Sequence, residues 1–64
     1  MITVIRDKSE IKAKWDPGLS LSGLLRLIKD RACYERATVN GITYRSFDFN
    51  CGAIPDGAVV EFFK

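Results

Sequence analysis

Two short turns between apolar segments constrain the fold of this chain more than any other feature. Asn40-Gly41 separates residues 37–39 from residues 42–45, and Asp56-Gly57 precedes an apolar run over residues 58–63. Asn-Gly between apolar segments is a strong hairpin signal, because both residues tolerate a positive φ. We therefore expect strands over residues 37–39 and 42–45, and a last strand over residues 59–63.

The N-terminal segment has the pattern of a second hairpin. Residues 2–6 are β-branched and apolar on both faces, which favours a central strand over an edge strand. Residues 7–10 supply turn-forming side chains. Apolar and charged residues then alternate over residues 11–16, the period-two pattern of a half-buried strand. The basic residues between Lys8 and Lys14 fit the solvated side of such a hairpin.

One helix is expected between the two hairpins. Pro17-Gly18 breaks the preceding strand, and Ser20 can cap a helix by accepting from the free amides of its first turn. An apolar stripe follows at helical spacing, formed by Leu21, Leu24, Leu25, Ile28 and Ala32. Leu27 lies off this stripe and should be partly exposed. The helix should end within residues 32–34.

The remaining segment predicts one more short strand and a turn. Phe47 and Phe49 alternate with polar residues, which indicates extended structure over residues 47–50. Pro55 is favoured at the second position of a turn over residues 54–57. The whole chain of 64 residues makes a single domain, 1–64. We expect an α+β fold, with a mixed four- to five-stranded sheet and one helix packed across it.

In this order, the motifs resemble those of the sulfur-carrier family of ThiS and MoaD type, over most of the chain. Residues 20–25 (Ser-Leu-Ser-Gly-Leu-Leu) are similar to the start of the family's helix, and Val39-Asn40-Gly41 to its central strand and turn. Residues 56–63 are similar to its Asp-Gly-Asp-x-Val-x-Phe-Phe ending, with Ala58 and Val59 at positions that are usually polar. The resemblance implies a ubiquitin-like β-grasp, in which the first and last strands lie side by side.

The last strand carries the candidate binding residues. If Val60 and Phe62 point into the core, period-two alternation places Val59, Glu61 and Phe63 on the opposite face. Apolar groups flanking one carboxylate there could form a partner-binding patch. The alternative is that these are scattered surface residues without a function. The resemblance implies that this region docks on an adenylating enzyme, or on a larger synthase subunit, in thiamine or molybdopterin cofactor synthesis.

The resemblance also implies a C-terminal tail ending in Gly-Gly, whose carboxylate carries sulfur. The sequence stops at Lys64, where this tail should begin, so Lys64 occupies the carrier position. Two explanations stay open: the sequence is a truncated version of a longer protein, or it is a family member that no longer carries sulfur. In the second case we expect a non-conjugating β-grasp interaction module.

Several kinds of chemistry find no support in the composition. The chain has no histidine, which removes Ser-His and Cys-His catalysis. Two cysteines are too few for a structural zinc site or an iron–sulfur cluster. We expect no enzyme activity, no metal and no cofactor. Cys33 is expected to be buried and inert, and Cys51, beside Gly52 in a loop, to be exposed.

The charge and hydropathy patterns bear on partners and location. Ten basic and eight acidic residues give a net charge of +2, and neither sign forms a block. A nucleic-acid-binding module is a third hypothesis, using Arg6, Lys8, Lys12 and Lys14, but it lacks a row of exposed aromatics for base stacking. No apolar segment approaches the ~20 residues needed to span a bilayer. We expect a cytoplasmic protein that does not bind membranes.

Overall fold

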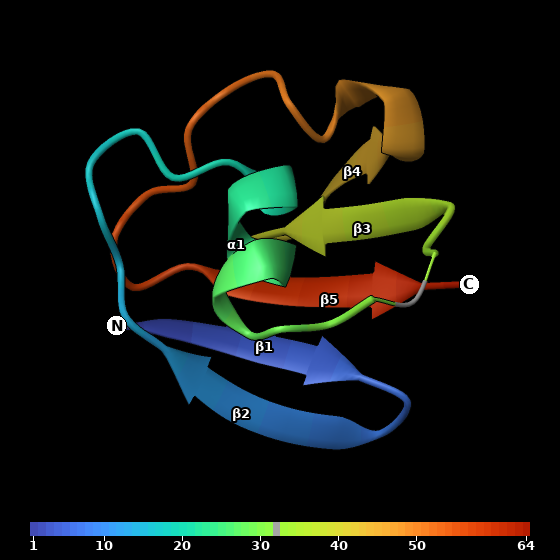
Figure 1. Cartoon of the computed structure of the whole chain (residues 1–64), viewed down its shortest axis with the longest axis horizontal. Helices are drawn as coiled ribbons and strands as arrows, with labels where there is room; N and C mark the ends of the chain where they lie inside the picture. Colours follow the sequence, from blue (N-terminus) through green and yellow to red (C-terminus); the bar gives the residue numbers. More distant parts are fainter. Residues whose placement is uncertain (32) are drawn as a thin grey trace.

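The computed structural model describes residues 1–31 and 33–64, which form a five-stranded sheet with one α-helix packed across it (Figure 1). The elements follow in the order β1 (Ile2–Arg6), β2 (Ser9–Ala13), α1 (Leu21–Leu27), β3 (Arg36–Val39), β4 (Ile42–Arg45), a 3₁₀ helix (Ser46–Asp48) and β5 (Val59–Phe63). The predicted α+β class and mixed sheet are therefore confirmed. Ala32, which the sequence places on the helix stripe, lies outside the described residues.

The strand order is β2-β1-β5-β3-β4. The first and last strands lie side by side, as the resemblance implies. They run parallel, whereas the other neighbouring strands are antiparallel. Strand β5 is therefore in the middle of the sheet, between β1 and β3 (Figure 1). Its central position brings residues from both halves of the chain next to the candidate binding residues.

The first hairpin is tighter than expected. Its turn consists of Asp7 and Lys8, whose φ angles are 48° and 64°, so that β2 already begins at Ser9. Strand β2 also ends at Ala13, and the prediction that the strand continues through Trp15 is wrong. The indole N–H of Trp15 donates instead to the carbonyl of Ile54, 2.7 Å away. A long-range hydrogen bond thus takes Trp15 out of the period-two pattern.

Helix α1 begins as predicted but ends earlier. The Ser20 hydroxyl accepts from the Gly23 amide at 3.1 Å, which confirms the predicted cap. The helix ends at Leu27 and not within residues 32–34, because Lys29 adopts a φ of 58°. The amide of Lys29 bonds the carbonyl of Arg26 at 3.1 Å, and that of Asp30 bonds the carbonyl of Leu25 at 3.0 Å. This pair of bonds is the Schellman motif, which closes a helix.

The second hairpin has the predicted turn. Asn40 and Gly41 have φ angles of 52° and 87°, the combination that a type I′ turn requires. The Asn40 amide donates to the carbonyl of Val59 at 2.9 Å, and the Asn40 side-chain oxygen accepts from the Val59 amide at 3.0 Å. Asn40 therefore both forms the turn and ties the hairpin to the start of β5.

The predicted strand over residues 47–50 is wrong. The chain forms the 3₁₀ helix Ser46–Asp48 there, in which Phe47 is 75% exposed and the following Phe49 is buried. Phe49 packs edge-on against Phe62, with ring centroids 6.0 Å apart. In a 3₁₀ helix with about three residues per turn, side chains two residues apart point in different directions, whereas in a strand both would point to the same side.

The core fills the space between the sheet and α1. Val60 and Phe62 of β5 are 0% and 3% exposed, which confirms their predicted inward orientation. The other buried apolar side chains are Ile2, Val4, Ala13, Leu21, Leu24, Tyr34, Ala37, Val39, Phe49, Ile54 and Ala58. Leu27 is 43% exposed, as its position off the helix stripe predicts. The helix therefore packs on one side of the sheet, and no described helix or strand covers the other side (Figure 1).

Candidate protein-binding face

The uncovered side of the sheet, which we call the open face, carries the three residues predicted from β5. Val59, Glu61 and Phe63 alternate with the buried Val60 and Phe62 along the strand. Val59 is 46% exposed, whereas Glu61 and Phe63 are half-buried. The predicted orientation is therefore confirmed, and the three side chains form a row along the middle strand of the sheet.

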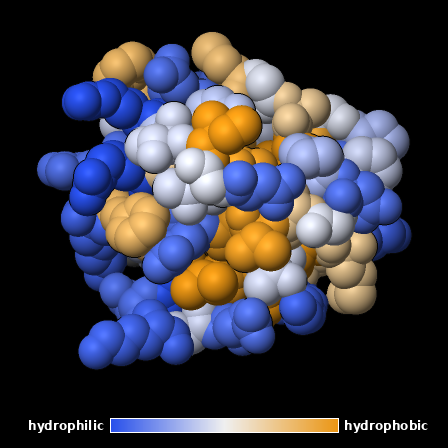
Figure 2. Space-filling view, turned by 180° about the vertical axis from the view of Figure 1, so that it is seen from behind, coloured by the Kyte–Doolittle hydropathy of each residue, from blue (hydrophilic) through white to orange (hydrophobic). Residues whose placement is uncertain are grey.

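The neighbouring strands extend this row sideways. In the parallel pair with β1, Val59 lies beside Thr3, and Glu61 lies beside Ile5. In the antiparallel pair with β3, Glu61 lies beside Thr38. Figure 2 shows a strip of apolar side chains across the centre of this face, bounded by hydrophilic ones. The apolar groups that strand register places on the open face are Ile5, Val59 and Phe63.

Arg36 of β3 lies directly beside Phe63 in the sheet. Its guanidinium carbon is 5.6 Å from the centre of the Phe63 ring, within the range of a cation–π contact. The arginine covers part of the aromatic ring while its charge still faces solvent, because Arg36 itself is exposed. Phe63 is thus partly shielded by a side chain that a partner could displace or pair with.

The charged groups of the open face surround the apolar strip. Lys12 of β2 donates to the hydroxyl of Thr3 at 2.6 Å, at the end of the strip that Val59 occupies. Arg36 lies at the opposite end, beside Phe63, and Arg45 lies beside Arg36 on the next strand. Glu61 is the acidic residue in the middle strand. A partner that covers the strip would therefore meet basic groups at two ends, the carboxylate of Glu61 at the centre, and that of Glu10 on β2 beside Ile5.

Lys64 follows directly after β5 and is exposed. Its ammonium group is 3.7 Å from a carboxylate oxygen of Asp7 and 6.0 Å from the centre of the Tyr34 ring. Ion pairs between exposed side chains contribute little, about 0–1 kcal/mol. Lys64 therefore follows the end of the middle strand with its ammonium group on the helix side, near Tyr34, and only weak contacts hold it.

A polar cluster ties β1 to the segment after α1, on the helix side of the sheet. The guanidinium of Arg6 and the hydroxyl of Tyr34 both donate to the same carboxylate oxygen of Asp30, Tyr34 at 2.6 Å. The hydrogen bond to Asp30, reinforced by burial, raises the pKa of Tyr34 above its ordinary value. Arg6 is therefore committed to this cluster, whereas Lys12 lies on the open face, so the cations of the nucleic-acid hypothesis do not share one surface.

Both cysteines are exposed free thiols. The prediction for Cys51 is confirmed, but the prediction that Cys33 is buried is wrong. The helix that was expected to reach Cys33 has already ended at Leu27, so this residue lies in the connection to β3. Within residues 1–31 and 33–64, no three cysteine or carboxylate side chains gather as a metal site would require. No helix among the described residues is long and apolar enough to cross a membrane.

Sequence reasoning missed the contribution of Arg36 to the open face. The alternation along β5 identified Val59, Glu61 and Phe63, but pairing of β3 with β5 and their register depend on long-range contacts. Ile5 alternates with the buried Ile2 and Val4 along β1 and therefore lies on the open face. Only the strand order shows that Ile5 lies beside Glu61.

Comparisons with protein-family models, with curated proteins and with solved structures give no match for this chain.

Proposed function

We propose that this chain is a β-grasp protein-interaction domain that binds a folded protein partner through its open face. The observation that carries the proposal is the row of Val59, Glu61 and Phe63 on the solvent side of the middle strand. Strand order and the single helix across the sheet are compatible with a β-grasp.

The composition of the open face supports binding of a protein surface. Aromatic and arginine side chains are enriched at the energetic centres of interfaces, and Phe63 stacked with Arg36 supplies both. Ile5 and Val59 add aliphatic area beside them, and Glu61 gives the centre a fixed charge that selects the partner. The partner surface should therefore be apolar at its centre, with a basic or hydrogen-bond-donating group that faces Glu61.

Position-specific crosslinking in the native host tests this proposal. A photoreactive amino acid at position 59 should give a discrete adduct whose protein component binds the purified chain, whereas the same probe at position 27 should not. Leu27 is the matched control, because its exposure of 43% is close to the 46% of Val59 and it lies on the helix side. Equal labelling from both positions would contradict the proposal.

The variant Phe63→Asp provides the quantitative version of this experiment. It should weaken binding of the captured partner by roughly thirtyfold or more, since loss of a central aromatic costs ~2 kcal/mol or more. Leu27→Asp should leave the affinity unchanged. Circular dichroism should show that both variants keep the wild-type fold, and loss of folding in Phe63→Asp would show that this residue belongs to the core.

A second, more specific function follows from the resemblance to sulfur carriers. We propose that the partner is an adenylating enzyme and that the chain is a sulfur-carrier-like protein of thiamine or molybdopterin synthesis. The observation that favours this function is the position of Lys64, which is exposed and directly follows the middle strand that carries the open-face row. A terminal carboxylate in this region would reach an enzyme that is docked on that face.

Intact mass spectrometry of the protein purified from its own host tests sulfur carriage. A working carrier should include a species with residues beyond Lys64 that end in glycine, part of it shifted by exchange of one oxygen for sulfur. A single species without such a tail would rule out sulfur carriage. That outcome would leave the interaction domain, which the crosslinking experiment tests separately.

A further inference from the structure

Strand β4 forms one edge of the sheet, and part of its backbone is available for pairing. In a two-residue turn, the carbonyl before the turn bonds the amide after it, here Val39 with Ile42. Residue pairs in an antiparallel ladder alternate between hydrogen-bonded and non-hydrogen-bonded. The backbone N–H and C=O groups of Tyr44 therefore also point toward β3, whereas those of Thr43 and Arg45 point outward, away from the sheet. The same alternation predicts a hydrogen-bonded pair at Ser46, and the Ser46 amide does donate to the carbonyl of Glu35 at 3.0 Å.

The two edges of the sheet differ in how they are protected. Charged side chains are a common device that keeps an edge strand from pairing, and β2 carries two of them, Glu10 and Lys12. Strand β4 instead has three residues of high β-propensity, Ile-Thr-Tyr, before its single charge at Arg45. Ile42 is 61% exposed. Within the described residues, no hydrogen bond occupies the outward groups of Thr43 and Arg45.

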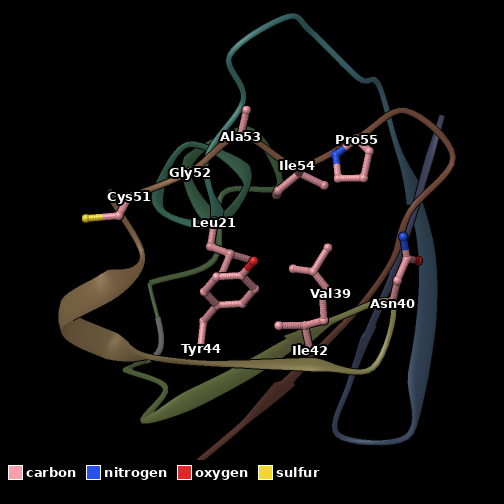
Figure 3. Close-up of a pocket in the computed structure, with 10 residues that line it drawn as sticks. All are labelled: Leu21, Val39, Asn40, Ile42, Tyr44, Cys51, Gly52, Ala53, Ile54 and Pro55. Atoms are coloured by element: carbon pink, nitrogen blue, oxygen red, sulfur yellow. The ribbon is translucent and has the colours of Figure 1, made fainter.

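An apolar hollow lies beside β4 on the helix side. It has a volume of about 100 Å³, and Figure 3 shows the aliphatic side chains of Leu21, Val39, Ile42 and Ile54 and the ring of Tyr44 around it, with the sulfur of Cys51 pointing away. A cavity of 150 Å³ holds a benzene molecule, so this one fits a single aliphatic side chain. Ile42 and Tyr44 connect the hollow directly to the edge strand.

The other side of the same edge carries uncompensated positive charge. Arg36 and Arg45 lie directly opposite each other on β3 and β4. Like charges in this position destabilise a strand pair. Neither guanidinium forms an ion pair with a described residue. Carboxylates on an adjoining strand would relieve this repulsion.

We propose that an extended segment of a partner protein, with alternating aliphatic and acidic residues, adds to the sheet as a sixth strand along β4. Its backbone bonds the outward groups of Thr43 and Arg45. Because side chains of a strand alternate between faces, an aliphatic residue opposite Tyr44 enters the hollow. Its acidic neighbours lie on the open face, beside Arg45. Strand addition of this kind obtains its affinity from main-chain bonds and its specificity from alternate side chains.

A second copy of this chain is the competing occupant of the edge. Pairing β4 with β4 of another molecule would place two Arg36–Arg45 pairs on one continuous sheet face. This arrangement adds repulsion between like charges and brings no carboxylate to either pair. The charge pattern therefore favours the acidic segment.

A synthetic peptide tests the inference with the chain as it is. Fluorescein-labelled Glu-Val-Glu-Leu-Glu-Val-Glu should bind with a dissociation constant below about 1 mM in fluorescence anisotropy. Lys-Val-Lys-Leu-Lys-Val-Lys should bind at least about tenfold more weakly. Backbone amide NMR shifts on adding the acidic peptide should concentrate in residues 42–45 and 51–55. Shifts centred on β2 or on Val59, or equal affinity for the two peptides, would overturn the inference.

Proline substitutions at outward-facing edge positions provide matched variants. Thr43→Pro removes an amide that forms no hydrogen bond inside the sheet, and it should weaken binding of the acidic peptide by at least about tenfold. Glu10→Pro makes the same change on the other edge, because Glu10 also occupies a non-bonded position of its hairpin, and should leave the affinity unchanged. Arg45→Glu keeps every backbone amide and should also lower the affinity for the acidic peptide by at least about tenfold.

Two results would contradict strand addition at β4. One is full peptide affinity in both Thr43→Pro and Arg45→Glu. The other is a concentration-dependent dimer in sedimentation analysis that Thr43→Pro abolishes, since a second copy would then occupy the edge. The inference does not depend on the proposed function: a failure here leaves the crosslinking result at position 59 unaffected, and failure of that experiment leaves the peptide result unaffected.

Discussion

Adjacent residues in β5 have opposite roles, and this is the main lesson at the scale of single residues. Val60 is fully buried in the core, whereas Val59 is 46% exposed on the open face. The two side chains are chemically identical, so any difference between substitutions at the two positions reports only which face each residue occupies. Arg36 shows the same dependence, because its contact with Phe63 arises from cross-strand register.

We predict that Val60→Asp unfolds the domain and that Val59→Asp does not. A carboxylate without a partner in the core costs several kcal/mol, on the order of 2–7 kcal/mol for a polar group. The core of a domain this small supplies roughly 3–5 kcal/mol. At position 59 the cost should be about 1 kcal/mol, the span of β-propensity. Far-UV circular dichroism and thermal melts measure both; a native-like melt of Val60→Asp would refute the orientation of β5.

The cluster of Arg6, Asp30 and Tyr34 predicts a pH dependence. The pKa of Tyr34 is raised in the folded state by its hydrogen bond to Asp30, so the hydroxyl contributes its full stability below the ordinary pKa of 10.0. This contribution is lost as the pH rises through the raised value. Tyr34→Phe should reduce the free energy of unfolding by about 1–2 kcal/mol at pH 8.

Urea titrations of wild type and Tyr34→Phe at several pH values measure this difference. The difference in the free energy of unfolding should stay constant up to about pH 9 and shrink above pH 10. Above pH 10 the Tyr34 hydroxyl ionises more readily in the unfolded state than in the folded state, which favours unfolding of the wild type only. Lysine ionisation is common to both proteins and cancels in the comparison. A difference that grows with alkaline pH would contradict the assigned hydrogen bond.

At the scale of elements, short signals at the ends decide where helices and hairpins lie. Ser20 starts α1, and the Schellman bonds around Lys29 end it after seven residues. A helix this short is marginal by itself, so it depends on its cap and on its packing against the sheet. The Asn40-Gly41 turn plays the corresponding role for β3 and β4.

We predict that Ser20→Ala destabilises the domain by about 1 kcal/mol, the usual value of a serine cap. The loss arises because the Gly23 amide no longer has its side-chain acceptor. Ser22→Ala is the matched control inside the helix and should be neutral or slightly stabilising, since alanine has the higher helix propensity. Denaturant midpoints of the two variants give the comparison; equal midpoints would argue against the cap.

At the scale of the whole molecule, the strand order divides the sheet into a protected centre and two exposed edges. Strands β1, β5 and β3 have a neighbour on both sides, whereas β2 and β4 have one. The parallel pairing of β1 with β5 joins the two ends of the chain, so the domain closes only when residues far apart in sequence have met. The open face and the free edge both follow from this single arrangement.

Native-state hydrogen exchange should reproduce this division. We predict the slowest amides in β1 and β5, at or near the global free energy of unfolding. In β4, the amide of Tyr44 should exchange more slowly than those of Thr43 and Arg45, which face outward. Two-dimensional NMR in deuterated buffer measures each amide. Protection of Thr43 and Arg45 equal to that of Tyr44 would show that the edge is already occupied.

Much of the fold could be predicted because its signals are local. The inward and outward residues of β5 follow from the period of a strand, the hairpin from Asn40-Gly41, and the helix start from Ser20. Each of these depends on steric preferences or hydrogen bonds that neighbouring residues satisfy by themselves. The sequence alone therefore determined the two hairpins, the start of the helix, the last strand and the predicted residues of the open face.

The remaining features were decided by contacts between distant segments. Trp15 leaves its strand to bond the carbonyl of Ile54, and Phe49 turns inward to pack on Phe62, contrary to the alternation of its own segment. The early end of α1 exposes Cys33. The meeting of Arg36 with Phe63 required the register of β3 on β5. Tertiary structure decided these points because a buried polar group or aromatic ring gains more from a long-range partner than local periodicity can offer.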